Sequence, residues 1–113
     1  MRKFCSHVVV ENFFEPCILF LVSQKSSYGY DIKKKMSDDC LCDVNVGNLY
    51  RALARMQKSG FITKSKVKGT LGPSRIEYSI TPKGKEYLAS WIVSLEKQQE
   101  AISRLITNYK KSL

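Results

Sequence analysis

The fold is decided by the segment NVGNLYRALARMQKSG, residues 45–60. Asn45 can cap a helix that begins here, and Gly60 stands just past its expected end. The apolar side chains of the segment recur at spacings of four and three residues and form one stripe, which consists of Leu49, Leu53 and Met56. A separate stripe is polar and consists of Asn48, Arg51, Arg55 and Lys58. The pattern predicts a helix that packs on one side and presents an amide and three cations on the other.

Two shorter helices are expected before this segment. Pro16 can occupy the first turn of a helix over residues 15–24, where most side chains are apolar. Periodicity alone leaves a buried strand open as the alternative for that run. A second helix is expected over residues 28–38, with Ser26 or Ser27 as its cap. Its apolar face consists of Tyr28, Ile32 and Met36, which are four residues apart.

A β-hairpin is expected after the segment. Residues 61–68 and 75–81 partly alternate apolar and polar side chains, and glycine and proline punctuate the residues between them. Thr81 and Pro82 then fit the cap and first position of a final helix over residues 82–111. That helix would be about 45 Å long at 1.5 Å per residue, which exceeds what a small core can cover.

The last helix carries a long apolar stripe that a single chain cannot bury. Much of this stripe must meet another chain or the N-terminal arm, so we expect a homodimer. The residues expected at the dimer interface are Phe13, Leu88, Trp91, Ile92, Leu95, Ile102, Leu105, Ile106 and Tyr109. Trp91 has two interpretations: it packs in the interface, or it stacks on a small aromatic or hydrophobic effector.

The order of elements predicts a mainly α protein with a small β-hairpin. Three helices followed by a hairpin describe a winged helix-turn-helix, in which the third helix can enter the major groove of DNA. Residues 1–81 are expected to form this DNA-binding domain together with an N-terminal arm, and residues 82–113 a C-terminal dimerisation helix.

The positive charge is concentrated on the expected third helix and hairpin. The chain of 113 residues has a net charge of +9. Residues 44–85 hold nine cations and one anion, a net +8, whereas the other 71 residues hold ten cations and nine anions. A surface made only for solubility would mix the two signs. The distribution therefore favours a polyanionic partner, and double-stranded DNA is the expected one.

The expected DNA contacts come from the second helix, the third helix and the hairpin. They are Tyr28, Lys33, Gly47, Asn48, Tyr50, Arg51, Arg55, Lys66, Lys68, Ser74 and Arg75. Several have simpler interpretations: Asn48 and Arg51 on a solvated helix face, Gly47 as a turn glycine, and Tyr50 in the core. Arg55 lies further along the helix and would touch phosphate or water, and Arg75 would otherwise brace the hairpin.

Four segments together resemble the PadR-like transcriptional regulators. They are Tyr28–Ile32, Val46–Leu53, Gly60–Ile62 and Gly72–Gly84, which follow in the family's order. The resemblance covers residues 14–110 and is similar to the short subfamily with one C-terminal helix. It implies a homodimeric, ligand- or stress-responsive repressor that binds a pseudo-palindromic operator. Residues 12–16 and 47–51 are most similar to a branch named for its response to polyhydroxybutyrate, while Tyr28 stands where the family often has His.

Other classes of function find less support in the sequence. No nucleophile, phosphate loop or paired carboxylates of an enzyme are visible, and no cofactor is expected. Metal binding is not expected, because Cys5, His7, Cys40 and Cys42 lack the usual ligand spacing. The alternative function is a basic adaptor for an acidic protein or an anionic membrane surface. Since no signal peptide or membrane span is expected, we predict a cytoplasmic, nucleoid-associated protein.

Overall fold

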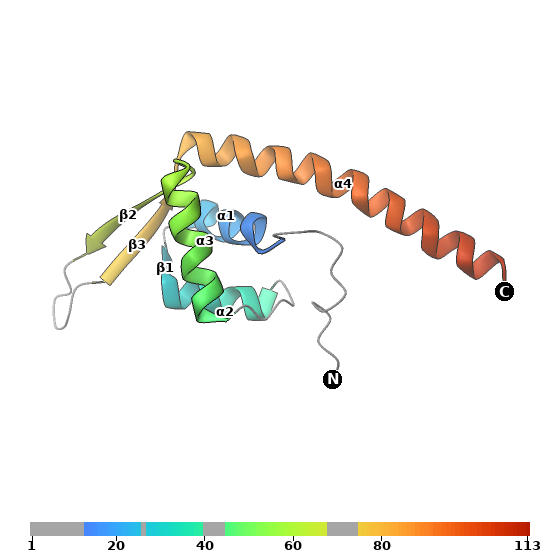
Figure 1. The fold of residues 1–113 in the computed structure, drawn as a ribbon, viewed down its shortest axis with the longest axis horizontal. Coiled ribbons are helices and arrows are strands. Elements are labelled where there is room, and N and C mark those ends of the chain that lie inside the picture. The colour runs from blue at the N-terminus through green and yellow to red at the C-terminus, as the bar shows by residue number, and fades with distance from the viewer. Residues whose placement is uncertain (1–12, 26, 40–44, 68–74) are drawn as a thin grey trace.

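A computed structural model of the chain describes residues 13–25, 27–39, 45–67 and 75–113. In chain order the elements are α1 (Phe14–Gln24), β1 (Ser27–Tyr28), α2 (Gly29–Asp39), α3 (Val46–Lys58), β2 (Ile62–Val67), β3 (Arg75–Ile80) and α4 (Pro82–Lys111). Figure 1 shows α1, α2 and α3 gathered beside the strands, whereas α4 extends away from this group toward the C-terminus. The mainly helical fold with a small hairpin is the one that the sequence predicts.

The core lies where α1, α2 and α3 meet the sheet. Its largest fully buried side chains come from all three helices and from β2, and they are Ile18, Leu19, Ile32, Met36, Leu49, Leu53, Met56 and Ile62. The apolar run that could have been a strand is the helix α1. The capped start of α3 is confirmed as well, because the Asn45 side chain accepts a hydrogen bond of 2.8 Å from the backbone N–H of Asn48.

The sheet has a third strand that the sequence analysis missed. Its order is β1-β3-β2, and both pairings are antiparallel. Ser27 pairs with Tyr78 and Tyr28 with Glu77, so α2 begins only at Gly29. The expectation that Ser26 or Ser27 caps a helix starting at residue 28 was therefore wrong at this end. A strand of two residues has no periodicity to detect, and it exists only because β3 offers it a pairing edge.

The turn from α3 to β2 is fixed against the start of α4. Gly60 has a φ of 83°, a left-handed conformation that glycine adopts without steric cost. The Thr81 side chain caps α4 by accepting from the N–H of Gly84, and it lies 2.6 Å from the carbonyl oxygen of Gly60. A Cβ at Gly84 would lie only 2.0 Å from the carbonyl oxygen of Phe61. Helix α4 therefore begins in close contact with the end of the α3–β2 turn.

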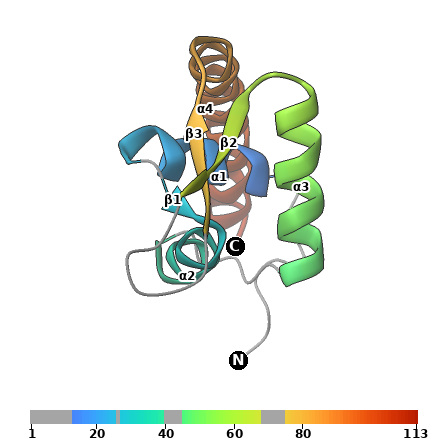
Figure 2. The same ribbon diagram turned by 90° about the vertical axis from the view of Figure 1, so that its left-hand side faces the viewer.

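Helix α4 is longer than the domain it leaves. It has 30 residues, and the molecule is 62 Å long. Figure 2 looks nearly along α4 and shows it passing behind the sheet and α1. Leu88, like Phe13 before α1, packs against the core of its own chain. Residues 99–113 are all exposed, so the second half of α4 has no cover from the part of the chain that is described.

Candidate nucleic-acid interface

Three of the predicted DNA contacts meet at the exposed start of α3. Asn48 and Arg51 are one turn apart, and the Arg51 guanidinium donates a hydrogen bond to Oδ1 of Asn48. Gly47 lies beside them, where a Cβ would be 3.5 Å from Nη1 of Arg51. That is ordinary van der Waals contact, so the packing of the chain does not require glycine here. A glycine within a helix costs about 1 kcal/mol relative to alanine, which is a reason to look for an external cause.

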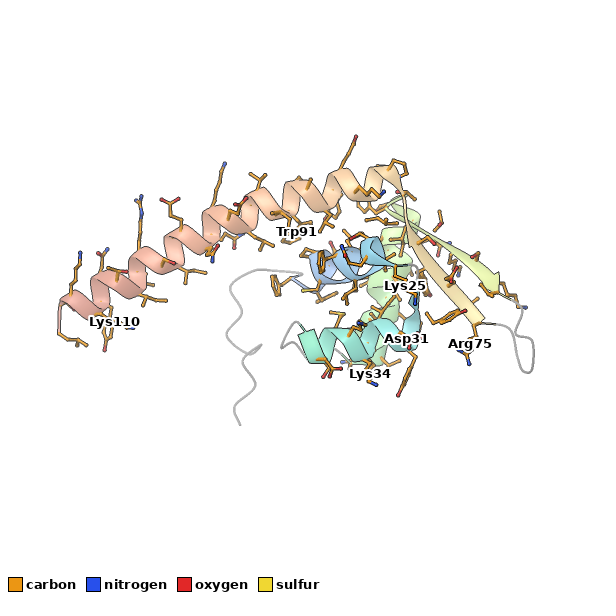
Figure 3. The ribbon with its side chains drawn as sticks, turned by 180° about the vertical axis from the view of Figure 1, so that it is seen from behind. Lys25, Asp31, Lys34, Arg75, Trp91 and Lys110 are labelled. Atoms are coloured by element: carbon orange, nitrogen blue, oxygen red, sulfur yellow. The ribbon has the colours of Figure 1, made fainter. Side chains whose placement is uncertain are left out.

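A cavity of about 430 Å³ opens next to this cluster. Its walls come from β1, from the start of α2, from α3 and from β3, and the lining residues are Tyr28, Gly29, Tyr30, Asp31, Tyr50, Arg75, Ile76 and Tyr78. The Arg75 guanidinium lies over the ring of Tyr28, 5.4 Å from its centroid. Figure 3 shows Arg75 on β3 near Asp31 of α2, on the side of the domain opposite to α4. We call this feature the tyrosine cavity.

The surroundings of two cavity tyrosines, Tyr50 and Tyr78, affect their packing and their ionisation. The Tyr50 hydroxyl lies where a side chain of Gly29 would begin, since a Cβ there would be 2.5 Å from the Tyr50 oxygen. Tyr78 is buried, and burial raises the pKa of its hydroxyl from 10.0, with a smaller contribution from the charge of Tyr50. Tyr78 therefore adds a neutral hydroxyl to the lining of the cavity, which also contains the cationic Arg75.

The remaining predicted contacts fall into different environments. Lys66 is exposed on β2 and pairs directly with Ile76, so it lies on the same face of the sheet as that cavity residue. Lys33 is half-buried on α2. Lys68 and Ser74 lie outside the described residues, as do Cys5, His7, Cys40 and Cys42. The structure thus brings Tyr28, Tyr50 and Arg75 together at the cavity, beside Gly47, Asn48 and Arg51.

Arg55 is half exposed, and its guanidinium is paired with a carboxylate of its own chain. Its Nε and Nη2 atoms donate to Oε2 of Glu15 at 3.2 and 2.8 Å. This guanidinium is expected from the sequence to touch phosphate or water, and in the free chain a buried carboxylate from α1 is its partner. The two residues are 40 positions apart, and no local pattern reveals such a pair.

The sequence analysis also missed Tyr30, Asp31 and Tyr78 as cavity residues. The available signal was an excess of tyrosine in the segments around the predicted third helix. It could not be used, because the walls of the cavity come from three segments that only the folded chain brings together.

The predicted dimer surface is partly a structural contact and partly an exposed stripe. Leu88 packs inward, and Trp91 and Leu95 are half-buried, with Trp91 lying edge-on to the ring of Tyr87. Figure 3 shows Trp91 on the side of α4 that faces the rest of the domain. The exposed large apolar residues of α4 are Ile92, Val93, Ile102, Leu105, Ile106 and Tyr109, and Leu105 has 69% of its surface exposed. We call these six residues the α4 stripe.

The arrangement of these elements defines a class of protein. A core of three helices followed by an antiparallel hairpin, with the third helix exposing its polar face, is a winged helix-turn-helix domain. The model of the transcriptional regulator PadR-like family matches residues 18–90. The chain therefore belongs to the PadR-like family of transcriptional regulators, which is a family of regulators and not of enzymes.

Solved structures of this family superpose well on the chain. A PadR-like regulator from Bacillus cereus is 34% identical with a TM-score of 0.74, and the match covers 82% of this chain and 90% of that one. A transcriptional regulator from Clostridium thermocellum is 29% identical with a TM-score of 0.73, covering 86% and 97%. Bacillus subtilis PadR in complex with operator DNA has the same fold, with 22% identity, a TM-score of 0.67 and coverage of 74% and 49%. Among curated proteins, no sequence matches this chain.

Two further structural observations concern other kinds of site. Within residues 13–25, 27–39, 45–67 and 75–113, no three His, Cys, Asp or Glu side chains gather in a group that could hold a metal ion. No helix in the same ranges is both long enough and apolar enough to cross a membrane.

Proposed function

We propose that this chain is a sequence-specific DNA-binding repressor that binds a pseudo-palindromic operator as a homodimer. The observation that carries the proposal is the joint position of Gly47, Asn48 and Arg51 at the exposed start of α3, next to the tyrosine cavity. A basic helix face beside a basic hairpin is the electrostatic footprint of a DNA-binding module. The Bacillus subtilis relative, whose structure was solved with operator DNA, supports this assignment.

The start of α3 supplies the groups that would read bases. Arginine pairs with two acceptors of guanine, and asparagine pairs with adenine, in the major groove. Arg51 and Asn48 are hydrogen-bonded to each other in the free protein, so they are already held at the same end of the helix. Gly47 leaves the backbone open to close approach, which explains a glycine that internal packing does not need.

The cavity and the hairpin supply the groups that would hold the DNA backbone. Arg75, Tyr28 and Tyr50 line the tyrosine cavity, Lys66 pairs with the cavity residue Ile76, and Lys33 follows on α2. Such phosphate contacts fix the register of the protein and carry no sequence information themselves. Lys68 and Ser74 extend the same role to the hairpin connection. Arg55 is left out of the proposed contacts because Glu15 already binds it.

The α4 stripe supports the homodimer. Exposed apolar side chains along one helix are costly in water, and a second copy of the same helix offers a matching surface. A dimer presents two copies of α3, so operator half-sites would be about one helical turn or a multiple of it apart. A small aromatic or hydrophobic effector would act on this dimer, and the polyhydroxybutyrate-responsive branch remains a prediction based on residues 12–16 and 47–51.

Binding to DNA selected from genomic fragments tests the proposal. The logarithm of the binding constant should fall with the logarithm of salt concentration by roughly 0.9 per phosphate contact. Arg51→Ala should weaken binding to the selected site by about 1–3 kcal/mol, because it removes a base-reading group. Lys97→Ala, an exposed cation on α4, is the matched control. A salt slope near zero would exclude DNA as the partner, and equal losses for both variants would remove Arg51 from the site.

A further inference from the structure

A buried carboxylate joins three helices of the domain. Glu15 lies in the first turn of α1, and only 10% of its side chain is exposed. Its Oε2 accepts from Nε and Nη2 of Arg55 on α3, and its Oε1 accepts from the hydroxyl of Tyr87 on α4 at 3.1 Å. We call Glu15, Arg55 and Tyr87 the Glu15 hub. Both oxygens of one carboxylate are therefore used, each by a different helix.

The hub continues into the turn that precedes β2. The ring of Tyr87 stacks on Phe61 with centroids 4.0 Å apart and planes 5° from parallel, and Trp91 meets the same ring edge-on. Phe61 directly follows the α3–β2 turn, and its carbonyl oxygen faces Gly84 at the start of α4. The angle between α3 and α4 is thus set from two sides: by the backbone contact at Gly84 and by the hub one turn further along.

Burying a carboxylate is energetically costly if the contact serves only to stabilise the fold. Removing its charge from water costs several kcal/mol, and apolar side chains of similar volume often serve a core as well or better. What a carboxylate adds is direction, because the paired N–H donors of a guanidinium and a single hydroxyl must lie close to its plane. Half of the Arg55 side chain is exposed, so this pair forms at the edge of the core.

We propose that Glu15 is a positioning residue that fixes α3 relative to α4, and that it thereby sets which spacing of operator half-sites the dimer accepts. This inference rests on the proposed function, because α3 would read the half-site and α4 would join the two chains. Two recognition helices held on rigid supports fit only one separation along the DNA. If α3 can change its orientation relative to α4, the dimer accepts several separations of the half-sites and prefers its best one less strongly.

The test compares operators that differ only in the spacer between their half-sites. The selected operator and versions with one or two base pairs added or removed are titrated with the wild type, Tyr87→Phe, Glu15→Gln and the control Glu100→Gln. Tyr87→Phe removes only the hydroxyl and leaves the ring to stack on Phe61. Glu100 pairs with Arg104 within α4 and joins no second element, so its loss should leave spacing unaffected.

The expected result is a loss of spacing discrimination without a loss of half-site recognition. The preference of the wild type for its best spacing should fall by about ten-fold or more in Tyr87→Phe, because the hydrogen bond from α4 to the charged carboxylate is lost. Binding to an isolated half-site should stay within about two-fold of the wild type, since that variant leaves α3 intact. Equal weakening at every spacing, or unchanged discrimination, would overturn the inference.

A second measurement needs no DNA and separates this inference from the proposed function. Residual dipolar couplings of the backbone amides report the orientation of α3 relative to α4. In the wild type both helices should fit one alignment, and in Tyr87→Phe they should no longer do so. If the wild type binds no specific DNA, the proposed function fails. A common alignment retained in Tyr87→Phe contradicts the positioning role whatever the DNA result.

Discussion

At the scale of single residues, the proposed interface is defined by side chains that constrain one another before any partner arrives. Asn45 caps α3 through the N–H of Asn48, and the side chain of Asn48 in turn accepts from Arg51. Two successive hydrogen bonds therefore connect the cap residue Asn45 to the Arg51 guanidinium that is proposed to read bases. Side chains held in this way lose less conformational freedom on binding, which is a source of affinity that adds no contact.

The buried hydroxyl of Tyr78 gives a prediction about alkaline pH. Burial raises its pKa above 10.0 in the folded chain, so the fold keeps a proton that the unfolded chain releases near that pH. Stability should be fully present below pH 10 and should fall as pH rises through the pKa of the folded state. Urea unfolding at a series of pH values from 8 to 11 should show a shallower loss for Tyr78→Phe than for the wild type.

The matched control for this pH series is Tyr109→Phe, because Tyr109 is exposed on the second half of α4. It should lose stability with pH as steeply as the wild type does. Parallel curves for the wild type and Tyr78→Phe would show that the burial of Tyr78 has no part in alkaline unfolding.

At the scale of elements, the helices and the hairpin were predictable because they carry periodic patterns. The predicted final helix, 82–111, has the observed bounds of α4. Helix α3 begins at Val46, directly after its predicted cap, and ends at Lys58, two residues before Gly60. The Asn45 and Thr81 caps were readable because capping is local chemistry. In contrast, β1 has no pattern of its own, and the Glu15–Arg55 pair joins residues that only the tertiary fold brings together. The tyrosine cavity was missed for the same reason.

The junction of α4 with the α3–β2 turn gives a prediction about packing. A side chain at Gly84 would overlap the backbone carbonyl of Phe61, which accepts a hydrogen bond from the N–H of Thr81. Gly84→Ala must displace backbone atoms, so it should lower the free energy of unfolding by about 2–3 kcal/mol, in the range for overpacked sites. Denaturant unfolding measures this loss.

Gly29→Ala provides the comparison for Gly84→Ala, since both glycines lie near the start of a helix. The atom that a new Cβ would meet at Gly29 is the hydroxyl of Tyr50, the far end of a side chain that can rotate away. The loss of stability should be under about 1 kcal/mol, in the lower part of the range for single substitutions, because the Tyr50 side chain can move and a backbone carbonyl cannot. Equal losses for the two variants would show that the Phe61 carbonyl is not the obstacle.

At the scale of the whole molecule, the charge and the apolar surface lie on different parts of the chain. The exposed cations Arg51, Lys66 and Arg75 belong to α3 and the hairpin, whereas the α4 stripe belongs to the helix that leaves the domain. Figure 1 shows α3 within the domain, whereas the second half of α4 extends away from it toward the C-terminus. A second chain bound along α4 would thus leave the proposed DNA surface of each copy free.

Substitution in the α4 stripe tests this division. Ile102→Asp puts a charge into the apolar face, where an unpaired charge is costly to bury, so it should convert the proposed dimer into monomers. Sedimentation at micromolar concentration measures the mass of the particle. Ser103→Asp adds the same charge at the neighbouring exposed position and should leave the mass unchanged. A wild type that sediments as a monomer would reject the dimer itself.

The exposed second half of α4 makes the folding of this helix dependent on the concentration of the protein. An isolated helix of that length is only marginally stable in water, so in the proposed dimer residues 99–111 would become fully ordered when the second chain covers them. Folding of the last four turns is then a bimolecular event, and mass action ties it to the number of copies in the cell. In the dilute regime, occupancy of an operator should rise with the square of the chain concentration. A twofold change in expression would then alter repression about fourfold, a sharper response to gene dosage than a monomeric regulator could give.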